Sequence, residues 1–125
     1  MKFRYTILYV DDVAATLAFY TKAFGMTQKM LHESGDYGVL ETGETQLCFA
    51  SRSMIRDTGI ELGPIGAPTF EVGLETDDVQ GSFDRAIAAG AKAVSPLETK
   101  PWGQTVSYVS DLNGFLVEIC SPIGS

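Results

Sequence analysis

Asp11-Asp12-Val13 is a short sequence that this chain uses twice, because it returns in the second half as Asp77-Asp78-Val79. Each copy follows a stretch in which apolar and polar residues alternate, as in a half-buried strand. Each copy also precedes apolar residues at helical spacing, and we interpret Asp11 and Asp77 as the helix caps, with no further role. The repeat predicts that one structural module occurs twice along the chain.

The first copy contains a strand, a helix and three further strands. The expected helix carries an apolar residue at every third or fourth position from Val13 to Phe24, and Gly25 ends it. Glycine-containing turns separate the strands that follow. The expected strands are Phe3–Val10, Thr27–Glu33, Tyr37–Thr42 and Thr45–Ser51.

The second copy has the same order of elements. Its helical stripe starts at Val79 and continues through Phe83 and Ala86, and Gly90 ends the helix. Asp111-Leu112-Asn113-Gly114 predicts the last turn, with Asn-Gly as its strongest signal. The expected strands are Phe70–Thr76, Lys92–Glu98, Thr105–Ser110 and Phe115–Ser121.

Two amphipathic helices and eight short strands predict an α+β fold with a helix on one face of each sheet. We expect one domain over residues 1–125, with module one at 1–51, a linker at 52–68 and module two at 69–125. The linker contains three glycines and two prolines, so it is also a candidate for a loop over a cleft.

Alternation along the strands assigns the residues of each sheet to two faces. In the last strand, Val117 and Ile119 would face the helix and Glu118 the opposite side. A carboxylate in an apolar strand needs water, a partner or a ligand, because its unpaired burial is costly. The face away from the helix is mixed in polarity in both modules, which is typical of a ligand cleft. It includes Tyr5, Ile7, Tyr9, Gln46, Cys48, Ala50, Glu71, Gly73, Glu75, Leu116, Glu118 and Cys120.

The net charge of −7 and the pI of about 4.5 argue against a nucleic-acid partner, which requires a basic surface. The same charge is compatible with a cationic small molecule. No apolar run reaches the length of a membrane span, and the amino-terminal residues read as a strand and not as a signal peptide. With Cys48 and Cys120 both in expected strands, these features predict a cytoplasmic protein with reduced thiols.

The sequence resembles the vicinal oxygen chelate superfamily, which includes glyoxalase I, bleomycin-resistance proteins, fosfomycin-modifying enzymes and extradiol dioxygenases. The resemblance covers essentially the whole chain and implies paired βαβββ modules that form a cupped mixed sheet, with a helix on the outer face of each module. It also implies a homodimer, which is common among small members. The matching pieces are Tyr9–Val13 with Phe19-Tyr20 and Phe24-Gly25, Thr76–Val79 with Ala88–Gly90, and Asp111–Glu118.

The resemblance also implies four positions for a divalent metal, which here hold Tyr5, Cys48, Glu71 and Glu118. Only Glu118 is the usual residue at its position, and Glu71 stands where His is common. Two carboxylates without imidazole favour Mg²⁺ or Mn²⁺, and Ni²⁺ and Zn²⁺ are the other ions to consider. The one histidine, His32, is expected in an outer strand away from these positions, so the iron site of the dioxygenases cannot form.

Glu118 is the candidate catalytic residue, because two carboxylates converging on one cleft would raise each other's pKa and create a general base. Pro101-Trp102-Gly103 is similar to a sequence of bleomycin-resistance proteins, which bind their drug in an aromatic groove without chemistry. Trp102 is therefore a candidate stacking platform. The other expected ligand-binding residues are Tyr5, Tyr9, Glu71, Gln104 and Tyr108.

Each of these residues also has a purely structural interpretation. Glu71 and Glu118 could be solvated or paired with a base such as Arg4 or Arg52. Trp102 could seal a sheet edge or a dimer interface, and the tyrosines could belong to the core. Cys48 fits a small buried hydrophobic residue better than a ligand or a nucleophile, because no histidine is expected beside it.

Three functions follow, of which we favour the first. It is a small-molecule-binding protein of the bleomycin-resistance type, connected with antibiotic resistance, which binds or sequesters a cationic aromatic compound without a metal. The second is a divalent-metal lyase or transferase of the glyoxalase I or fosfomycin-resistance type, with Glu71 and Glu118 as ligands. The third is a small dimeric domain without a ligand of its own.

Overall fold

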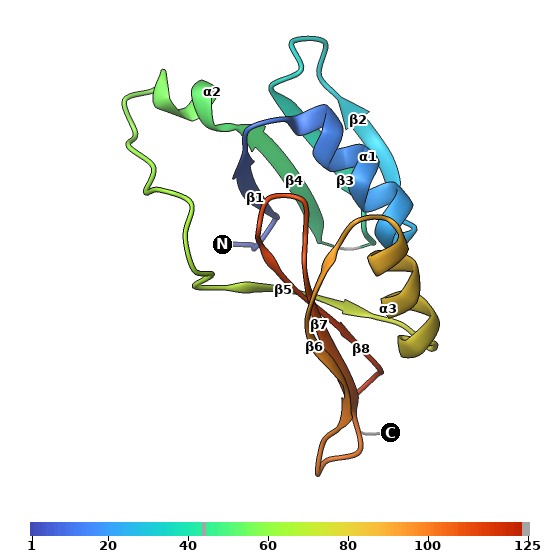
Figure 1. The fold of residues 1–125 in the computed structure, drawn as a ribbon. Coiled ribbons are helices and arrows are strands. Elements are labelled where there is room, and N and C mark those ends of the chain that lie inside the picture. Colours follow the sequence, from blue (N-terminus) through green and yellow to red (C-terminus); the bar gives the residue numbers. More distant parts are fainter. Residues whose placement is uncertain (44, 124–125) are drawn as a thin grey trace. The chain divides into compact units, whose positions relative to one another are not determined.

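The computed structural model describes residues 1–43 and 45–123 of the chain. The chain divides into two compact units, residues 1–64 and 65–125, and the boundary lies inside the expected linker. Each unit contains a long helix packed on one four-stranded sheet (Figure 1), which confirms the α+β fold with two βαβββ modules. That the two units make one domain stays a prediction.

The first unit consists of a mixed sheet in the order β1-β4-β3-β2 and two helices. The outer strand β1 pairs with β4 in parallel, whereas the other neighbours are antiparallel. The short helix α2 lies in the expected linker and was not predicted. Its N-cap is Ser51, whose hydroxyl accepts a hydrogen bond from the Met54 backbone N–H at 3.1 Å. The elements are β1 Tyr5–Val10, α1 Val13–Phe24, β2 Thr27–Leu31, β3 Tyr37–Glu41, β4 Gln46–Ser51 and α2 Arg52–Arg56.

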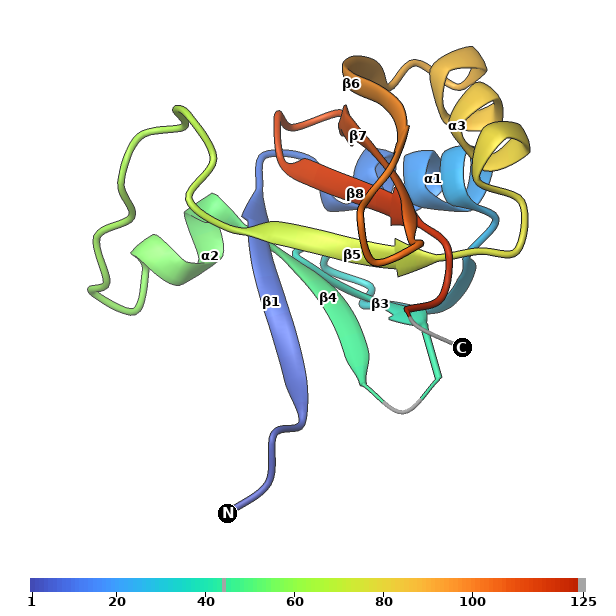
Figure 2. The same ribbon diagram turned by 90° about the horizontal axis from the view of Figure 1, so that it is seen from below.

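The second unit repeats this topology with the strand order β5-β8-β7-β6. Figure 2 shows β5 beside β8, its parallel neighbour, and the two remaining pairs are antiparallel. The observed strands agree with the expected ones to within a residue or two at each end. The elements are β5 Glu71–Glu75, α3 Val79–Ala88, β6 Lys92–Thr99, β7 Thr105–Ser110 and β8 Leu116–Cys120.

The two helix caps are Asp12 and Asp78, so the assignment to Asp11 and Asp77 was wrong by one residue. The carboxylate of Asp12 accepts from the Ala15 N–H at 2.9 Å, and Asp78 makes the equivalent bond to Gly81 at 2.9 Å. Only the residue directly before the first helical residue can reach these first-turn donors. The expected helix ends are confirmed, with glycines at positive φ closing both helices.

Alternation assigned the helix-facing residues correctly in both units. In the first unit Phe49 packs its ring against Tyr20 of α1, with 4.9 Å between ring centroids. Gly38 lets the helix approach β3, since a Cβ at this position would lie 2.5 Å from a Leu17 methyl carbon. In the second unit Val117 and Ile119 are almost fully buried, at 0% and 2% exposure. The opposite face of each sheet is therefore left for the remaining residues of the strands.

The turn between β7 and β8 forms through the side chain of Asp111 more than through Asn-Gly. The Asp111 carboxylate accepts from the backbone N–H groups of Asn113 and Phe115, each at 2.8 Å. Gly114 has a φ of 88°, whereas Asn113 lacks the positive φ that a two-residue Asn-Gly turn requires. In the described part of the chain, no helix is long and apolar enough to span a membrane.

Candidate functional site

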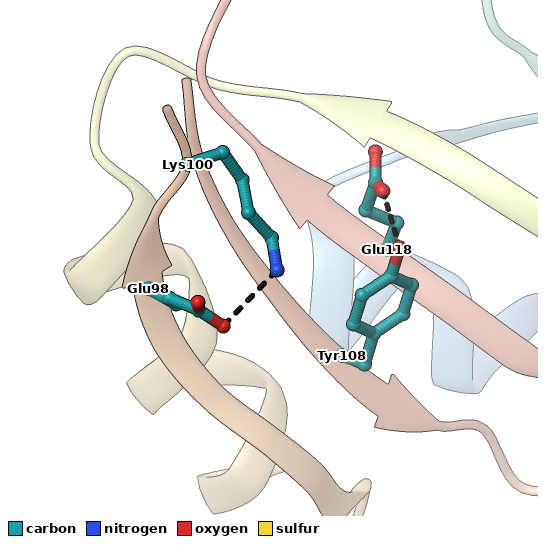
Figure 3. A network of polar contacts seen from close by, with 4 residues as sticks. All are labelled: Glu98, Lys100, Tyr108 and Glu118. Atoms are coloured by element: carbon teal, nitrogen blue, oxygen red, sulfur yellow. Dashed lines mark hydrogen bonds and ion pairs between the residues drawn. The ribbon is translucent and has the colours of Figure 1, made fainter. Parts of the chain in front are cut away.

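Tyr108 and Glu118 form a polar pair on the second sheet, on the face away from α3. They lie directly opposite each other on the antiparallel strands β7 and β8. The Tyr108 hydroxyl donates a hydrogen bond of 2.7 Å to Oε2 of Glu118 (Figure 3). This length is typical of a hydroxyl bound to an ionised carboxylate. Both side chains are half-buried, so the pair borders solvent and is within reach of a ligand.

On its other side Glu118 lies opposite Gly73 of the parallel strand β5. Since Gly73 has no side chain, β5 places none directly opposite Glu118, and a Cβ at this position would lie 4.0 Å from Oε1 of Glu118. Glu71 and Glu75 flank Gly73 on the same face, because side chains two residues apart on a strand point the same way. We call the surface formed by Glu71, Glu75, Tyr108 and Glu118 the acidic face.

The acidic face changes the proton affinity of two neutral groups. The hydrogen bond to Glu118 raises the pKa of Tyr108 well above its usual range, with further contributions from burial and from the charges of Glu118 and Glu71. Burial raises the pKa of Cys120 to about 11, helped by Glu118 and Glu75. Tyr108 and Cys120 are therefore neutral near pH 7, and the carboxylates supply the charge of this surface.

No basic side chain in residues 1–43 and 45–123 forms an ion pair with the carboxylates of the acidic face. Lys100, which directly follows β6, pairs instead with Glu98 at 3.0 Å (Figure 3). Arg52, considered as a partner from the sequence, donates to the Gly63 carbonyl at 2.6 Å. The interpretation of Glu71 and Glu118 as members of internal salt bridges therefore finds no support.

Trp102 and Gln104 lie in the loop between β6 and β7. Trp102 is 59% exposed, while its indole Nε1–H donates to Oε1 of Gln104 at 2.9 Å. The Gln104 amide is buried and donates from Nε2 to the Ser121 carbonyl at 3.0 Å. Five of the expected site residues thus come from one unit, namely Glu71, Trp102, Gln104, Tyr108 and Glu118.

The remaining expected residues, Tyr5, Tyr9 and Cys48, belong to the first unit. Tyr5 is half exposed and Tyr9 is half-buried, whereas Cys48 is fully buried between Ile7 and Val39 of the neighbouring strands. Burial raises the pKa of Tyr37 to about 12, with Cys48 and Tyr5 as smaller causes. The central row of this sheet face, Ile7, Cys48 and Val39, is apolar, so Cys48 fits the structural interpretation.

A metal centre at the four implied positions stays a prediction. Among the described residues, no group of three or more His, Cys, Asp or Glu side chains is arranged to hold an ion. Glu71 and Glu118 alone would supply two carboxylates, one of which already accepts the Tyr108 hydroxyl. His32 lies in the turn after β2 and not in a strand, where its Nδ1 is bonded to Ser34.

The sequence pattern does not single out Gly73, Glu75 and Cys120 as neighbours of Glu118. Strand alternation had put all three on the correct face, but neither a catalytic motif nor an unusual residue type distinguished them. Tyr37 was missed because the alternation was not extended to its strand. The signal that identifies all four is the strand register. It pairs Gly73 with Glu118 and Glu75 with Cys120 across β5 and β8, and Tyr37 with Ala50 across β3 and β4.

Comparison with known proteins shows which family this sequence matches. The family model described as the Glyoxalase/Bleomycin resistance protein/Dioxygenase superfamily matches residues 2–119. An uncharacterized protein of Mycobacterium bovis is 33% identical over 93% of this chain and 80% of its own length. A glyoxalase-related enzyme from Fulvimarina pelagi superposes with a TM-score of 0.83 at 21% identity, covering 99% of this chain and 93% of that chain. TioX from Micromonospora sp. ML1 gives a TM-score of 0.76 at 25% identity over 97% and 98% of the two chains.

Proposed function

Because the chain belongs to the glyoxalase/bleomycin resistance protein/dioxygenase superfamily, whose members commonly bind small molecules, we propose that it binds or sequesters a small cationic aromatic compound. The observation that carries this proposal is the acidic face, where the Glu118 carboxylate is oriented by Tyr108 and left open on the side of Gly73. This site works by binding and requires no covalent step.

Charge selects the ligand class. Glu71, Glu75 and Glu118 share one sheet face without a basic partner in the described chain, so an anion would be repelled and a cation attracted. The Tyr108 hydroxyl uses one oxygen of Glu118 and leaves Oε1 to accept from an N–H donor. A protonated amine or a protonated aromatic nitrogen could donate this bond, and a hydrogen bond between charged groups is stronger than a neutral one. A quaternary aromatic cation, which has no N–H, would be attracted by the charge alone.

The aromatic part of the ligand would contact Trp102. The indole presents most of its surface to solvent, and aromatic faces attract flat cations through stacking and cation–π interactions. That Tyr5 and Tyr9 contact a ligand and that Glu118 acts as a base stay predictions. Homodimer formation, a cytoplasmic location and a connection with antibiotic resistance are likewise predictions.

The proposal is tested with three probes that have similar fused rings and different charge: N-methylquinolinium, 2-methylnaphthalene and naphthalene-2-carboxylate. Binding is followed by calorimetry and by fluorescence of the single tryptophan. We expect saturable binding of the cation, weaker binding of the neutral probe and none of the anion. Equal affinities for the three probes would show that the carboxylates do not select the ligand.

Glu118→Gln removes the charge and keeps the shape of the side chain. We expect the dissociation constant of N-methylquinolinium to rise about two- to fivefold, because this quaternary cation has no N–H and loses only its attraction to the carboxylate charge. Glu98→Gln is the matched control, because Glu98 is a carboxylate of the same sheet that is already paired with Lys100. The control should bind like the wild type.

Elemental analysis of protein purified without chelator separates the proposal from the metal-dependent alternative. About one divalent ion per chain, retained in the wild type and lost in Glu118→Ala, would favour a lyase or transferase with Glu71 and Glu118 as ligands. The same measurement is repeated after incubation with Mg²⁺, Mn²⁺, Ni²⁺ and Zn²⁺. A protein that takes up none of these ions and binds the cationic probe agrees with the proposal.

A further inference from the structure

The loop that carries Trp102 is held closed by its own backbone. The Lys100 N–H donates to the Gln104 carbonyl at 2.8 Å, and the Gly103 N–H donates to the Lys100 carbonyl at 2.9 Å. Gly103 has a φ of 90°, which this tight turn needs and other residues rarely adopt. The loop therefore has one defined backbone conformation before any ligand arrives.

The loop is also attached to the end of β8. The Thr105 N–H donates to Oγ of Ser121 at 2.9 Å, and the Ser121 N–H donates to the Thr105 carbonyl at 2.9 Å. Gln104 adds a third connection through its bond to the Ser121 carbonyl. Ser121 directly follows Cys120, which lies beside Glu118, so this attachment links the loop to the strand that carries the acidic face.

The side-chain amide of Gln104 connects the loop to the end of β8. Its oxygen accepts from Trp102 in the loop, and its nitrogen donates to Ser121 after the strand. The indole Nε1 can only donate and the Ser121 carbonyl can only accept, so the chemistry fixes which end of the amide is the oxygen. The Gln104 side chain is 6% exposed, and both ends of its amide are satisfied within the chain.

The hydrogen bond from Trp102 to Gln104 directs the indole N–H toward the protein, although Trp102 is an exposed residue. Trp102 is 59% exposed, yet its one side-chain donor is bound to the protein and not left to water. This restricts rotation about both side-chain torsions and leaves the ring surface open. A ring ordered in advance loses less entropy when a ligand stacks on it.

We propose that Gln104 is a positioning residue, which holds the indole of Trp102 as a fixed platform for the aromatic part of the ligand. The inference deepens the proposed function and rests on it for the identity of the stacked group. It assigns Gln104 to the support of the site, with Trp102 making the contact. The ordering of the ring itself is a property of the free protein and can be measured without a ligand.

The first test is hydrogen exchange of the indole Nε1–H in the unmodified protein, observed by NMR as one signal because the chain has one tryptophan. We expect exchange at least tenfold slower than in free N-acetyl-tryptophanamide, because the proton is bonded to Gln104. Exchange at the rate of the free compound would overturn the inference. This measurement needs no variant and therefore does not depend on the folding of one.

The second test uses Gln104→Met, which keeps the length of the side chain and removes both hydrogen bonds. We expect a fast local rotation in the fluorescence anisotropy decay of Trp102 and faster indole exchange. Gln80→Met is the control, because Gln80 is an exposed glutamine whose amide bonds only to Asp84 on α3. Unchanged local motion in Gln104→Met would contradict the proposal.

The affinity for N-methylquinolinium connects the two proposals without confusing them. Loss of the platform should raise the dissociation constant about two- to tenfold in Gln104→Met, the usual cost of ordering one large side chain. If the wild type binds none of the probes but its indole is ordered, the proposed function fails and the positioning role of Gln104 stands. If the probe binds equally well to a mobile indole, the reverse holds.

Discussion

The two modules build the same sheet and use its free face in opposite ways. At the centre of the first sheet, Ile7, Cys48 and Val39 lie side by side on β1, β4 and β3. The equivalent row of the second sheet is Gly73, Glu118 and Tyr108 on β5, β8 and β7. An apolar row thus corresponds to a glycine and a hydrogen-bonded polar pair. The shared fold therefore determines where these residues lie, and the residue types at the three positions of the row determine whether a module offers a polar site.

The helices of the two modules differ in how many of their residues are buried against the sheet. Six residues of α1 are buried, including Tyr20, whereas Val79 and Ala86 are the buried residues of α3. Ala86 occupies the position that corresponds to Tyr20 in the repeat. The Tyr20 ring contacts Phe19, Phe24 and Phe49, and the second module has no such aromatic cluster in its described residues. The module with more buried helix residues is therefore the one whose central row of strand residues is apolar.

The largest effect should come from making α1 resemble α3. Tyr20→Ala removes a fully buried ring from the aromatic cluster, and we expect the free energy of unfolding to fall by about 3–5 kcal/mol. The variant for comparison is Phe83→Ala in α3, where the ring is only half-buried. It should lower the free energy of unfolding by less than about 2 kcal/mol. Urea denaturation measures both. Equal losses would show that the two helices pack equally well.

The next effect comes from exchanging the central residues of the two rows. Cys48→Glu places a carboxylate where the wild-type side chain has 0% exposure, between two apolar neighbours. We expect a loss of about 3 kcal/mol or more near pH 8, because an unpaired buried charge is costly. Glu118→Cys removes a half-buried carboxylate and one hydrogen bond, and should cost about 1–2 kcal/mol.

The pH dependence of Cys48→Glu distinguishes charge from size. Burial would raise the pKa of the introduced carboxyl above its unfolded value, so the neutral form is favoured in the fold. The variant should therefore be most stable below about pH 4, and should lose stability relative to the wild type as the pH rises toward 8. A loss that is the same at pH 4 and pH 8 would indicate steric crowding alone.

The fold could be predicted from the sequence because its signals are local and occur twice. The Asp-Asp-Val repeat, the helical stripes and the strand alternation each report on a few neighbouring residues. The caps were misplaced by one position because two adjacent aspartates can both serve, and only the backbone at Asp12 and Asp78 decides between them. The helix α2 was missed because its glycine- and proline-rich surroundings indicate a loop.

The site could be predicted less completely, because it depends on register. Alternation assigns Glu118 to a face, but only the pairing of β7 with β8 puts Tyr108 opposite it, and only β5 puts Gly73 on its other side. Gln104 illustrates the same limit. Its parity suggested a ligand contact, whereas the bonds to Trp102 and Ser121 come from a loop and a strand end that no periodic pattern describes.

The smallest effect concerns Tyr37 and Tyr108. The pKa of each is raised, but for a different main reason. The hydrogen bond to Glu118 is the main reason for the raised pKa of Tyr108, whereas burial is the main reason that the pKa of Tyr37 is raised to about 12. Glu118→Gln should therefore move the titration of Tyr108 toward the ordinary value of about 10 and leave that of Tyr37 in place. Because both folded pKa values lie above the unfolded one, their contributions to stability are complete below about pH 10 and are lost as the pH rises through the folded values. NMR of ¹³C-labelled tyrosine follows each ring, with Tyr108→Phe and Tyr37→Phe for assignment. A Tyr108 titration that ignores Glu118→Gln would mean that burial, and not the polar pair, governs both modules alike.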